Sequence, residues 1–209
     1  MHDVIEDTDT TYENIEFVFG REVADLCAGM EKLSKVYYSG EERSIGSLRK
    51  MFVAMADDLR VIFIKLADRL HNMQTLENHP KLHKRQRIAL ETLNIYAPIA
   101  DRLGLYRFKH MLDEECFKIL KPNSHKRLKD ELTSLKASRD YYKKNAKREV
   151  EELLEKNNMK RFTVNFRIKS IYSIFKKMQR KGYSSVSELH DLYGVRIIVK
   201  DIATCYKVL

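Results

Sequence analysis

A nearly continuous apolar run in the middle of the chain most strongly limits what this sequence can fold into. Six apolar residues lie close together between positions 57 and 76: Val61, Ile62, Phe63, Ile64, Leu66 and Ala67. A helix that is apolar on most sides must be covered by neighbouring elements on most sides. His79-Pro80 marks its end, because a residue before proline disfavours the helical conformation. We therefore expect a buried central helix in a mainly helical domain.

Helical periodicity continues on both sides of this segment, and strand patterns appear only near the end of the chain. We expect helices over residues 12–35, 84–103 (kinked at Pro98), 106–120 and 125–157. A strand at 162–166, a helix at 171–178 and a strand at 194–199 follow. The predicted fold class is mainly α, with an all-helical domain over residues 1–120, a helical connector over 121–160 and the first part of an α/β domain over 161–209.

Composition excludes a membrane protein and a disulfide-rich secreted protein. No apolar run approaches the ~18 residues that span a bilayer, and the acidic start is unlike a signal peptide. Cys27, Cys116 and Cys205 lie far apart and form neither a disulfide framework nor a zinc cluster, which indicates a reducing compartment. We expect a cytoplasmic protein that does not bind membranes.

The net charge of +9 is unevenly distributed. Residues 1–30 carry eight acids and one arginine, a balance of −7, whereas residues 121–182 carry 19 Lys/Arg and seven acids, a balance of +12. The acidic end fits cation binding or a solvated surface. The basic segment fits an anionic partner or a solvated surface, and charge alone does not distinguish a nucleotide from a polynucleotide.

Two motifs separated by about sixty residues predict a metal site. If residues 2–7 are helical, His2 and Glu6 lie one turn apart, and so do Asp3 and Asp7. Imidazole and carboxylate ligands suit Mn²⁺ or Zn²⁺, and Asp68 would add an oxygen from the central helix. The remaining acids, Glu6 and Asp7, could orient or deprotonate a water. This set predicts metal-assisted phosphoester hydrolysis.

Polar residues in the same helix predict a nucleotide pocket. Asp68, Asn72 and Thr75 are spaced at i, i+4 and i+7, so they share one helical stripe. Asn72 would contact a ribose hydroxyl, and Lys65 or Arg69 would contact phosphate. The alternative is that these are ordinary polar residues of a buried helix, with Asp68 paired to a neighbouring arginine.

Residues 2–120 resemble the hydrolase domain of RelA/SpoT-family (p)ppGpp synthetase/hydrolases, a branch of the HD-domain phosphohydrolases. The resemblance rests on HDVIEDTD, KLSKV, LRKMFVAMADDLRVIFIKLADRLHNMQTL and ETLNIYAPIADRLG. It implies roles for seven residues: Mn²⁺ ligands His2, Asp3 and Asp68, catalytic acids Glu6 and Asp7, and pocket residues Asn72 and Thr75. The implied reaction, part of the stringent response, removes the 3′-pyrophosphate of ppGpp or pppGpp and leaves GDP or GTP.

Near the end of the chain, three cations and one acid predict a second phosphate site. Lys169 and Lys177 are eight residues apart, about two helical turns, and Arg167 precedes them. Such a trio could grip a triphosphate, and Asp191 could hold Mg²⁺ that bridges phosphates. The alternative is a solvated basic helix.

FRIKSIYSIFKKMQ and ELHDLYGVRIIVKD resemble the opening of the same family's synthetase domain, which transfers pyrophosphate from ATP to GDP or GTP. The resemblance implies that Arg167, Lys169 and Lys177 contact ATP phosphates and that Asp191 binds Mg²⁺. Phe166 and Ile168 stand where glycine and proline are more usual in the family.

The resemblance also predicts that the chain is truncated at both ends. In the family, a metal-ligand histidine and a guanine-stacking basic residue precede the pair that corresponds to His2 and Asp3. A catalytic glutamate and a GDP-binding loop follow the first part of the synthetase domain. We therefore expect both activities to be impaired in these 209 residues, and ribosome or tRNA binding only through absent C-terminal regions. Two other functions stay open: an HD phosphohydrolase for another nucleotide, and a non-catalytic basic fragment that binds nucleic acid or the ribosome.

Overall fold

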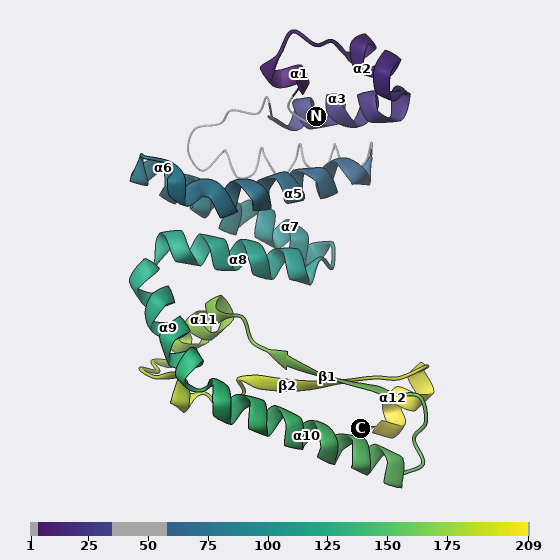
Figure 1. Cartoon of the computed structure of the whole chain (residues 1–209), viewed down its shortest axis with the longest axis vertical. Coiled ribbons are helices and arrows are strands. Elements are labelled where there is room, and N and C mark those ends of the chain that lie inside the picture. The colour runs from purple at the N-terminus through teal and green to yellow at the C-terminus, as the bar shows by residue number, and fades with distance from the viewer. Residues whose placement is uncertain (1–3, 35–57, 209) are drawn as a thin grey trace. The chain divides into compact units, whose positions relative to one another are not determined.

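The structure, a computed structural model, describes residues 4–34 and 58–208, apart from the side chains of residues 6, 7, 32–34 and 136–140. The chain divides into two compact units, residues 1–120 and 121–209 (Figure 1). Its fold is mainly helical with a two-stranded sheet in the second unit, which confirms the predicted fold class. Over the ranges described, no helix is both long enough and apolar enough to cross a bilayer.

A glycine divides the first long helix that the periodicity predicts. A short helix, α1 (Val4–Asp7), precedes this range, and in place of one helix over residues 12–35 the chain forms α2 (Tyr12–Phe19) and α3 (Arg21–Ser34). Gly20 has φ 85° and ψ 164°, a conformation that glycine adopts readily and other residues rarely do. The prediction of a single helix is therefore wrong at Gly20, and α2 packs against α3.

The central helix, α5 (Leu59–Thr75), lies where the apolar run predicts it. Asp58 begins it by accepting a hydrogen bond from the backbone N–H of Arg60, as an N-cap does. A single 3₁₀ turn, η1 (Leu76–Asn78), follows and ends before His79-Pro80, as predicted. Phe63 is 42% exposed, so α5 is buried on fewer sides than its composition predicts.

Helices α3 and α5 approach each other closely at one glycine. A Cβ atom added to Gly29 would lie only 2.8 Å from Cγ2 of the buried Val61. That separation is shorter than any ordinary carbon–carbon contact. The absence of a side chain at Gly29 therefore allows α3, on which α1 also packs, to lie against α5.

One turn of π-helix interrupts the helix predicted over residues 84–103. The elements are α6 (Leu82–Glu91), η2 (Thr92–Tyr96), α7 (Ala97–Arg102) and α8 (Tyr106–Leu120). Pro98 has no N–H to donate, so the α-helical ladder cannot run unbroken through this point. The N–H of Ala97 bonds to the carbonyl of Thr92, five residues back. The predicted kink is thus a π turn just before the proline, and α8 occupies its predicted range.

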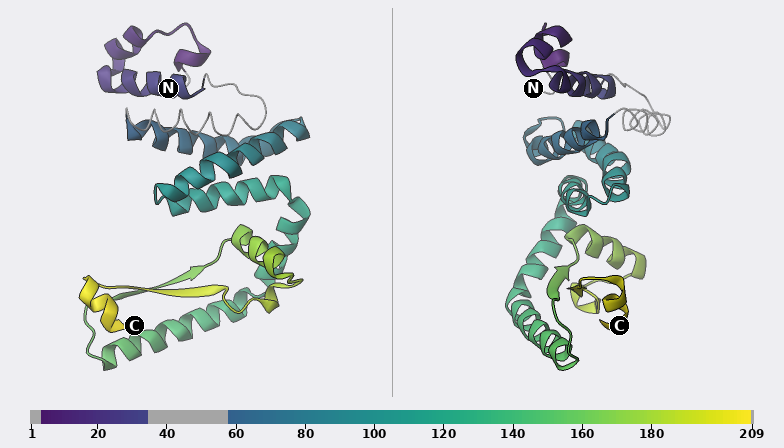
Figure 2. Two further views of the ribbon diagram at one scale, coloured as in Figure 1. Left: turned by 180° about the vertical axis from the view of Figure 1, so that it is seen from behind. Right: turned by 90° about the vertical axis from the view of Figure 1, so that its right-hand side faces the viewer.

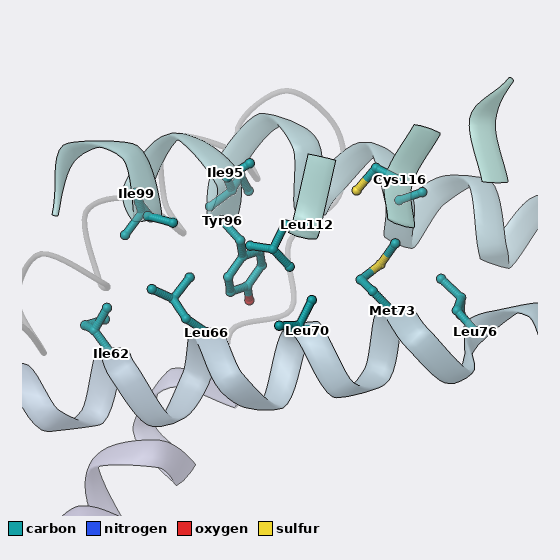
Figure 3. Close-up of a cluster of buried hydrophobic side chains, with 13 residues drawn as sticks. Ile62, Leu66, Leu70, Met73, Leu76, Ile95, Tyr96, Ile99, Leu112 and Cys116 are labelled. Carbon is teal, nitrogen blue, oxygen red and sulfur yellow. The ribbon is translucent and has the colours of Figure 1, made fainter. Parts of the chain in front are cut away.

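The core of the first unit lies between α5 and the helices that follow it (Figure 3). One face of α5 contributes Ile62, Leu66, Leu70, Met73 and Leu76. The facing side chains are Ile95, Tyr96, Ile99, Leu112 and Cys116. Burial of each large apolar side chain contributes ~1.5–3 kcal/mol, so this contact determines which face of α5 remains for polar residues.

The long amphipathic helix predicted over residues 125–157 is two helices, α9 (Pro122–Ser134) and α10 (Lys136–Lys156). They are separated at Leu135, whose ψ of 0° departs from helical geometry. Just before the break, the hydroxyls of Thr133 and Ser134 donate to backbone carbonyls of the preceding turn, at 2.7 Å each. Such bonds compete with the backbone ladder and bend helices, which explains why the single-helix prediction is wrong here.

The second unit contains an antiparallel strand pair, β1 (Thr163–Ile168) and β2 (Tyr193–Ile198), with Ile168 opposite Tyr193. Between the strands lie α11 (Ile171–Lys181) and η3 (Val186–Glu188), and α12 (Ile202–Val208) follows β2. Ser170 caps α11, and α10 packs along β1 (Figure 2). These strands and α11 match the predicted ranges to within three residues. The predicted connector, residues 121–160, belongs to this compact unit.

Candidate functional site

The polar stripe of α5 forms an ordered group around the Asp68 carboxylate. Asn72 donates from Nδ2 to Oδ1 of Asp68 at 2.9 Å, and Nζ of Lys65 lies 3.4 Å from Oδ2. The side chains of Lys65 and Asp68 are only 13% and 11% exposed. All three residues belong to one helix at spacings of three and four, which places them side by side on one face of α5. Among the residues that the structure describes, Lys65 is the cation that lies beside this carboxylate.

Thr75 continues the stripe, and its hydroxyl is hydrogen-bonded to the backbone of its own helix. Its hydroxyl donates to the carbonyls of His71 and Asn72, each at 3.3 Å. Thr75 and Asn72 are both exposed, so their polar groups can also reach solvent or a ligand. The structure thus brings Asp68, Asn72, Thr75 and Lys65 onto one part of α5.

Arg69, the other predicted phosphate contact, is bound to the next helices. Its Nη2 donates to Oε1 of Glu91 at 2.9 Å and to the hydroxyl of Tyr96 at 2.8 Å, and its guanidinium lies 4.1 Å from the Tyr96 ring centroid. Burial favours a lower pKa for this guanidinium, but the oxygens of Tyr96 and Glu91 outweigh burial and raise the pKa. A phosphate would have to replace both bonds, so Lys65 is the better candidate for that contact.

The described part of the predicted metal site is the Asp68 carboxylate. A carboxylate oxygen is a ligand that Mn²⁺ and other hard cations accept, so Asp68 fits this role. His2 and Asp3 lie outside the described residues, as do the side chains of Glu6 and Asp7, whose backbone forms the end of α1. Among the side chains that are described, no three from His, Cys, Asp and Glu gather as a metal site.

The second predicted cluster is assembled within the second unit. Asp191 directs Oδ2 to Nζ of Lys169 and Oδ1 to Nζ of Lys177, so each carboxylate oxygen has its own ammonium partner. The backbone N–H of Lys169 bonds to the carbonyl of Leu192 at 3.2 Å, which brings the end of β1 beside the start of β2. Ser170 begins α11 at this point and places Lys177 two turns further along.

The two lysines strongly favour the ionised form of Asp191. Hydrogen bonds from Lys169 and then Lys177 lower the pKa of this carboxyl to about 2. Asp191 is therefore negatively charged throughout the physiological pH range, as a ligand for Mg²⁺ must be. Its side chain is 49% exposed, so a bound ion could reach it from solvent.

Arg167, the third cation of this group, lies on β1 opposite Gly194. It is exposed and precedes Lys169 by two residues, so it lies at the same end of β1. The structure thus brings Lys169, Lys177 and Asp191 into contact, and it places Arg167 at the same end of the strand pair.

Sequence reasoning missed Glu91 and Tyr96, which hold Arg69. They lie 22 and 27 residues from Arg69 in the chain, so no helical spacing connects them to it. Their own separation of five residues fits the π turn of η2, an element that sequence periodicity does not predict.

Comparison with known proteins is consistent with the order of the two units. Residues 1–106 match the family of HD domains, and residues 166–209 match the family described as a region found in RelA / SpoT proteins.

Three relatives illustrate the similarity, and each aligns with the whole chain. A probable guanosine-3′,5′-bis(diphosphate) 3′-pyrophosphohydrolase of Synechocystis is 40% identical, the bifunctional (p)ppGpp synthase/hydrolase SpoT of Escherichia coli K12 is 42% identical, and a GTP pyrophosphokinase of Myxococcus xanthus is 41% identical. The chain spans 27%, 30% and 28% of their lengths, respectively.

Proposed function

We propose, from the premise that this chain belongs to the RelA/SpoT family, that it acts in the metabolism of (p)ppGpp. In this proposal the first unit binds ppGpp or pppGpp and contributes to removal of the 3′-pyrophosphate by water. The products are pyrophosphate and GDP or GTP. The observation that supports it most is the Asp68 carboxylate, nearly buried and oriented by Asn72 and Lys65 on one helix.

Eight residues of the first unit have defined parts in this proposal. His2, Asp3 and Asp68 would hold a divalent cation, Mn²⁺, which polarises the pyrophosphate and lowers the pKa of the attacking water. Glu6 and Asp7 would orient that water and accept its proton. Asn72 and Thr75 would contact the nucleoside, and Lys65 would neutralise phosphate charge.

We also propose that the second unit binds the phosphates of ATP for the synthetase reaction, transfer of pyrophosphate to the 3′-hydroxyl of GDP or GTP. Arg167, Lys169 and Lys177 would contact the phosphates, and Asp191 would hold the Mg²⁺ that bridges them. The pairing of one carboxylate with two lysines beside the start of α11 supports this proposal.

Metal and nucleotide binding test the first unit. We expect Asp68→Ala to weaken Mn²⁺ binding by at least tenfold in calorimetry and to remove Mn²⁺-dependent binding of ppGpp. Asp101→Ala, which changes an exposed aspartate of α7, serves as the matched control and should bind both ligands as the unaltered chain does. Unchanged Mn²⁺ affinity in Asp68→Ala would exclude its metal role.

The choice of nucleotide separates this proposal from its nearest alternative. With Mn²⁺ present, we expect the chain to bind ppGpp in preference to dATP, because dATP has no 3′-pyrophosphate. Preference for dATP would support an HD phosphohydrolase that acts on another nucleotide.

A further inference from the structure

The carboxylate of Asp191 already occupies both lysines of the proposed ATP site. One oxygen is paired with Lys169 and the other with Lys177, and the lysine side chains are 37% and 24% exposed. A phosphate that enters the site must therefore compete with an anion belonging to the protein. Phosphate and carboxylate compete for the same two ammonium groups, so the binding free energy of the entering phosphate is smaller than it would be with two unpaired lysines.

A divalent cation changes the outcome of that competition. If a polyphosphate displaces Asp191 without a cation, the carboxylate loses both partners and faces the negative phosphate oxygens. If the polyphosphate arrives with Mg²⁺, the displaced carboxylate gains a cation as its new partner, and the lysines take the phosphates. Only the second exchange leaves every charge of the cluster compensated.

From this geometry we propose that Asp191 determines ligand selectivity: it makes the site accept metal-loaded polyphosphate and disfavour metal-free polyphosphate. The inference rests on the proposed phosphate-binding function of the second unit and adds a specificity role to a residue expected only to hold Mg²⁺. Because coupling between two ligands is reciprocal, polyphosphate must also raise the affinity of the site for Mg²⁺ by the same factor.

A neutral residue at this position should reduce the preference for the metal-loaded form. In Asp191→Asn the lysines lose a negative competitor, so metal-free polyphosphate should bind more tightly. Each partly exposed ion pair is worth a factor of about five at most, so we expect a roughly five- to tenfold gain from removing two. The same change should weaken binding of the Mg²⁺ complex severalfold, because an amide is a poorer ligand than a carboxylate.

The experiment uses inorganic tripolyphosphate as the probe, titrated calorimetrically into the 209-residue chain at low salt. One series contains excess Mg²⁺ and the other contains EDTA, and the measured quantity is the ratio of the two affinities. Asp201→Asn is the matched control: Asp201 lies 3.5 Å from Lys200 beyond the other end of β2, and Asn keeps an oxygen for the cap on Thr204. It should leave the ratio unchanged, whereas Asp191→Asn should lower it at least tenfold.

The outcomes separate this inference from the function on which it rests. A tighter metal-free complex in Asp191→Asn, together with a weaker Mg²⁺ complex, supports the selectivity role. Binding of both forms with an unchanged ratio overturns the selectivity role alone and leaves the phosphate site intact. No binding of either form to the unaltered chain or to Asp191→Asn overturns the phosphate site, and the inference with it.

Lysine variants give a second measurement. Lys177→Met removes a phosphate partner and should weaken both forms, whereas Lys181→Met, an exposed lysine of the same helix, should weaken neither. Equal losses from both variants would mean that the probe senses general positive charge, which would overturn a built site at Asp191.

Discussion

A buried cation requires hydrogen-bond acceptors, and Arg69 obtains two of them from one short stretch of chain. Its side chain is 15% exposed, and Glu91 and Tyr96 both accept from the same nitrogen. An unpaired buried charge is costly, so these contacts hold α5 against η2. Arg69 directly follows Asp68, and the tie therefore fixes the position of the proposed metal ligand relative to the core.

Tyr96→Phe tests the hydrogen bond between Arg69 and Tyr96 without creating a large cavity. The ring remains in the core and beneath the guanidinium, but one acceptor of the buried cation is lost. Hydrogen bonds to charged groups contribute ~1.5–3 kcal/mol, and we expect the free energy of unfolding of the first unit to fall by about that amount.

Chemical denaturation provides the measurement, and Tyr106→Phe provides its control. Tyr106 is 58% exposed, and loss of its hydroxyl should change stability by less than ~0.5 kcal/mol. Equal effects of the two substitutions would show that the Tyr96 hydroxyl has no special role.

At the scale of single residues, motif spacing predicted the groups that the structure brings together. Asp68 with Asn72 and Lys65, and Asp191 with Lys169 and Lys177, were predicted because helix geometry and the family motifs relate them. The pairing of Arg69 was not predictable, because it depends on how α5 packs against a π turn formed later in the chain.

At the scale of elements, the misses share one physical origin. Periodicity correctly placed α5, α8 and α11, but it runs unchanged through points where the backbone leaves helical geometry. Gly20 breaks a helix by its positive φ, and the hydroxyls of Thr133 and Ser134 break another by bonding to carbonyls. Hydrophobic periodicity predicts neither a positive φ nor a hydrogen bond from a side chain to the backbone.

The contact between α3 and α5 gives a prediction at the same scale. Gly29→Ala places a methyl group 2.8 Å from Val61, so the helices must separate or Val61 must move. Overpacking costs ~1–3 kcal/mol, partly offset by the higher helix propensity of alanine, about 1 kcal/mol. A double-mutant cycle with Val61→Ala removes the offset from the comparison.

We expect a favourable coupling energy of about 1–2 kcal/mol between Gly29→Ala and Val61→Ala, measured by chemical denaturation. Val61→Ala makes room for the new methyl group, so the double variant should be more stable than the sum of the single changes predicts. Gly29→Ala with Ile174→Val, a buried position in the second unit, serves as the control and should be additive. Additivity in both pairs would mean that α3 and α5 do not meet at this point.

At the scale of the whole molecule, the uneven charge raises a question that fold and family leave open. The basic segment, with a balance of +12, could serve one compact phosphate site or an extended polynucleotide surface. The sequence alone does not distinguish these two functions, because a lysine of a compact phosphate site and a lysine of a polynucleotide surface can occur in the same sequence context. The structure adds a distinction: Lys169 and Lys177 converge on one carboxylate, whereas Lys143 and Lys144 are simply exposed on α10.

Salt dependence separates a compact site from a polynucleotide surface. A single-stranded RNA that contacts eight phosphates would give a slope of roughly −6 in log affinity against log salt concentration. We expect the compact site to use no more than three cations, so binding of Mg²⁺-tripolyphosphate should have a much shallower slope. Both slopes are measured by titration between low and physiological salt.

The matched variant is Lys143→Gln with Lys144→Gln, which removes two exposed charges of α10. We expect it to weaken any RNA attachment at low salt and to leave the affinity for Mg²⁺-tripolyphosphate unchanged, because neither lysine contacts Asp191. An RNA complex that is tighter than micromolar at physiological salt, has the steep slope and depends on these two lysines would contradict a compact phosphate site. The basic segment would then be a nucleic-acid surface, and the pairing at Asp191 would be incidental to its charge.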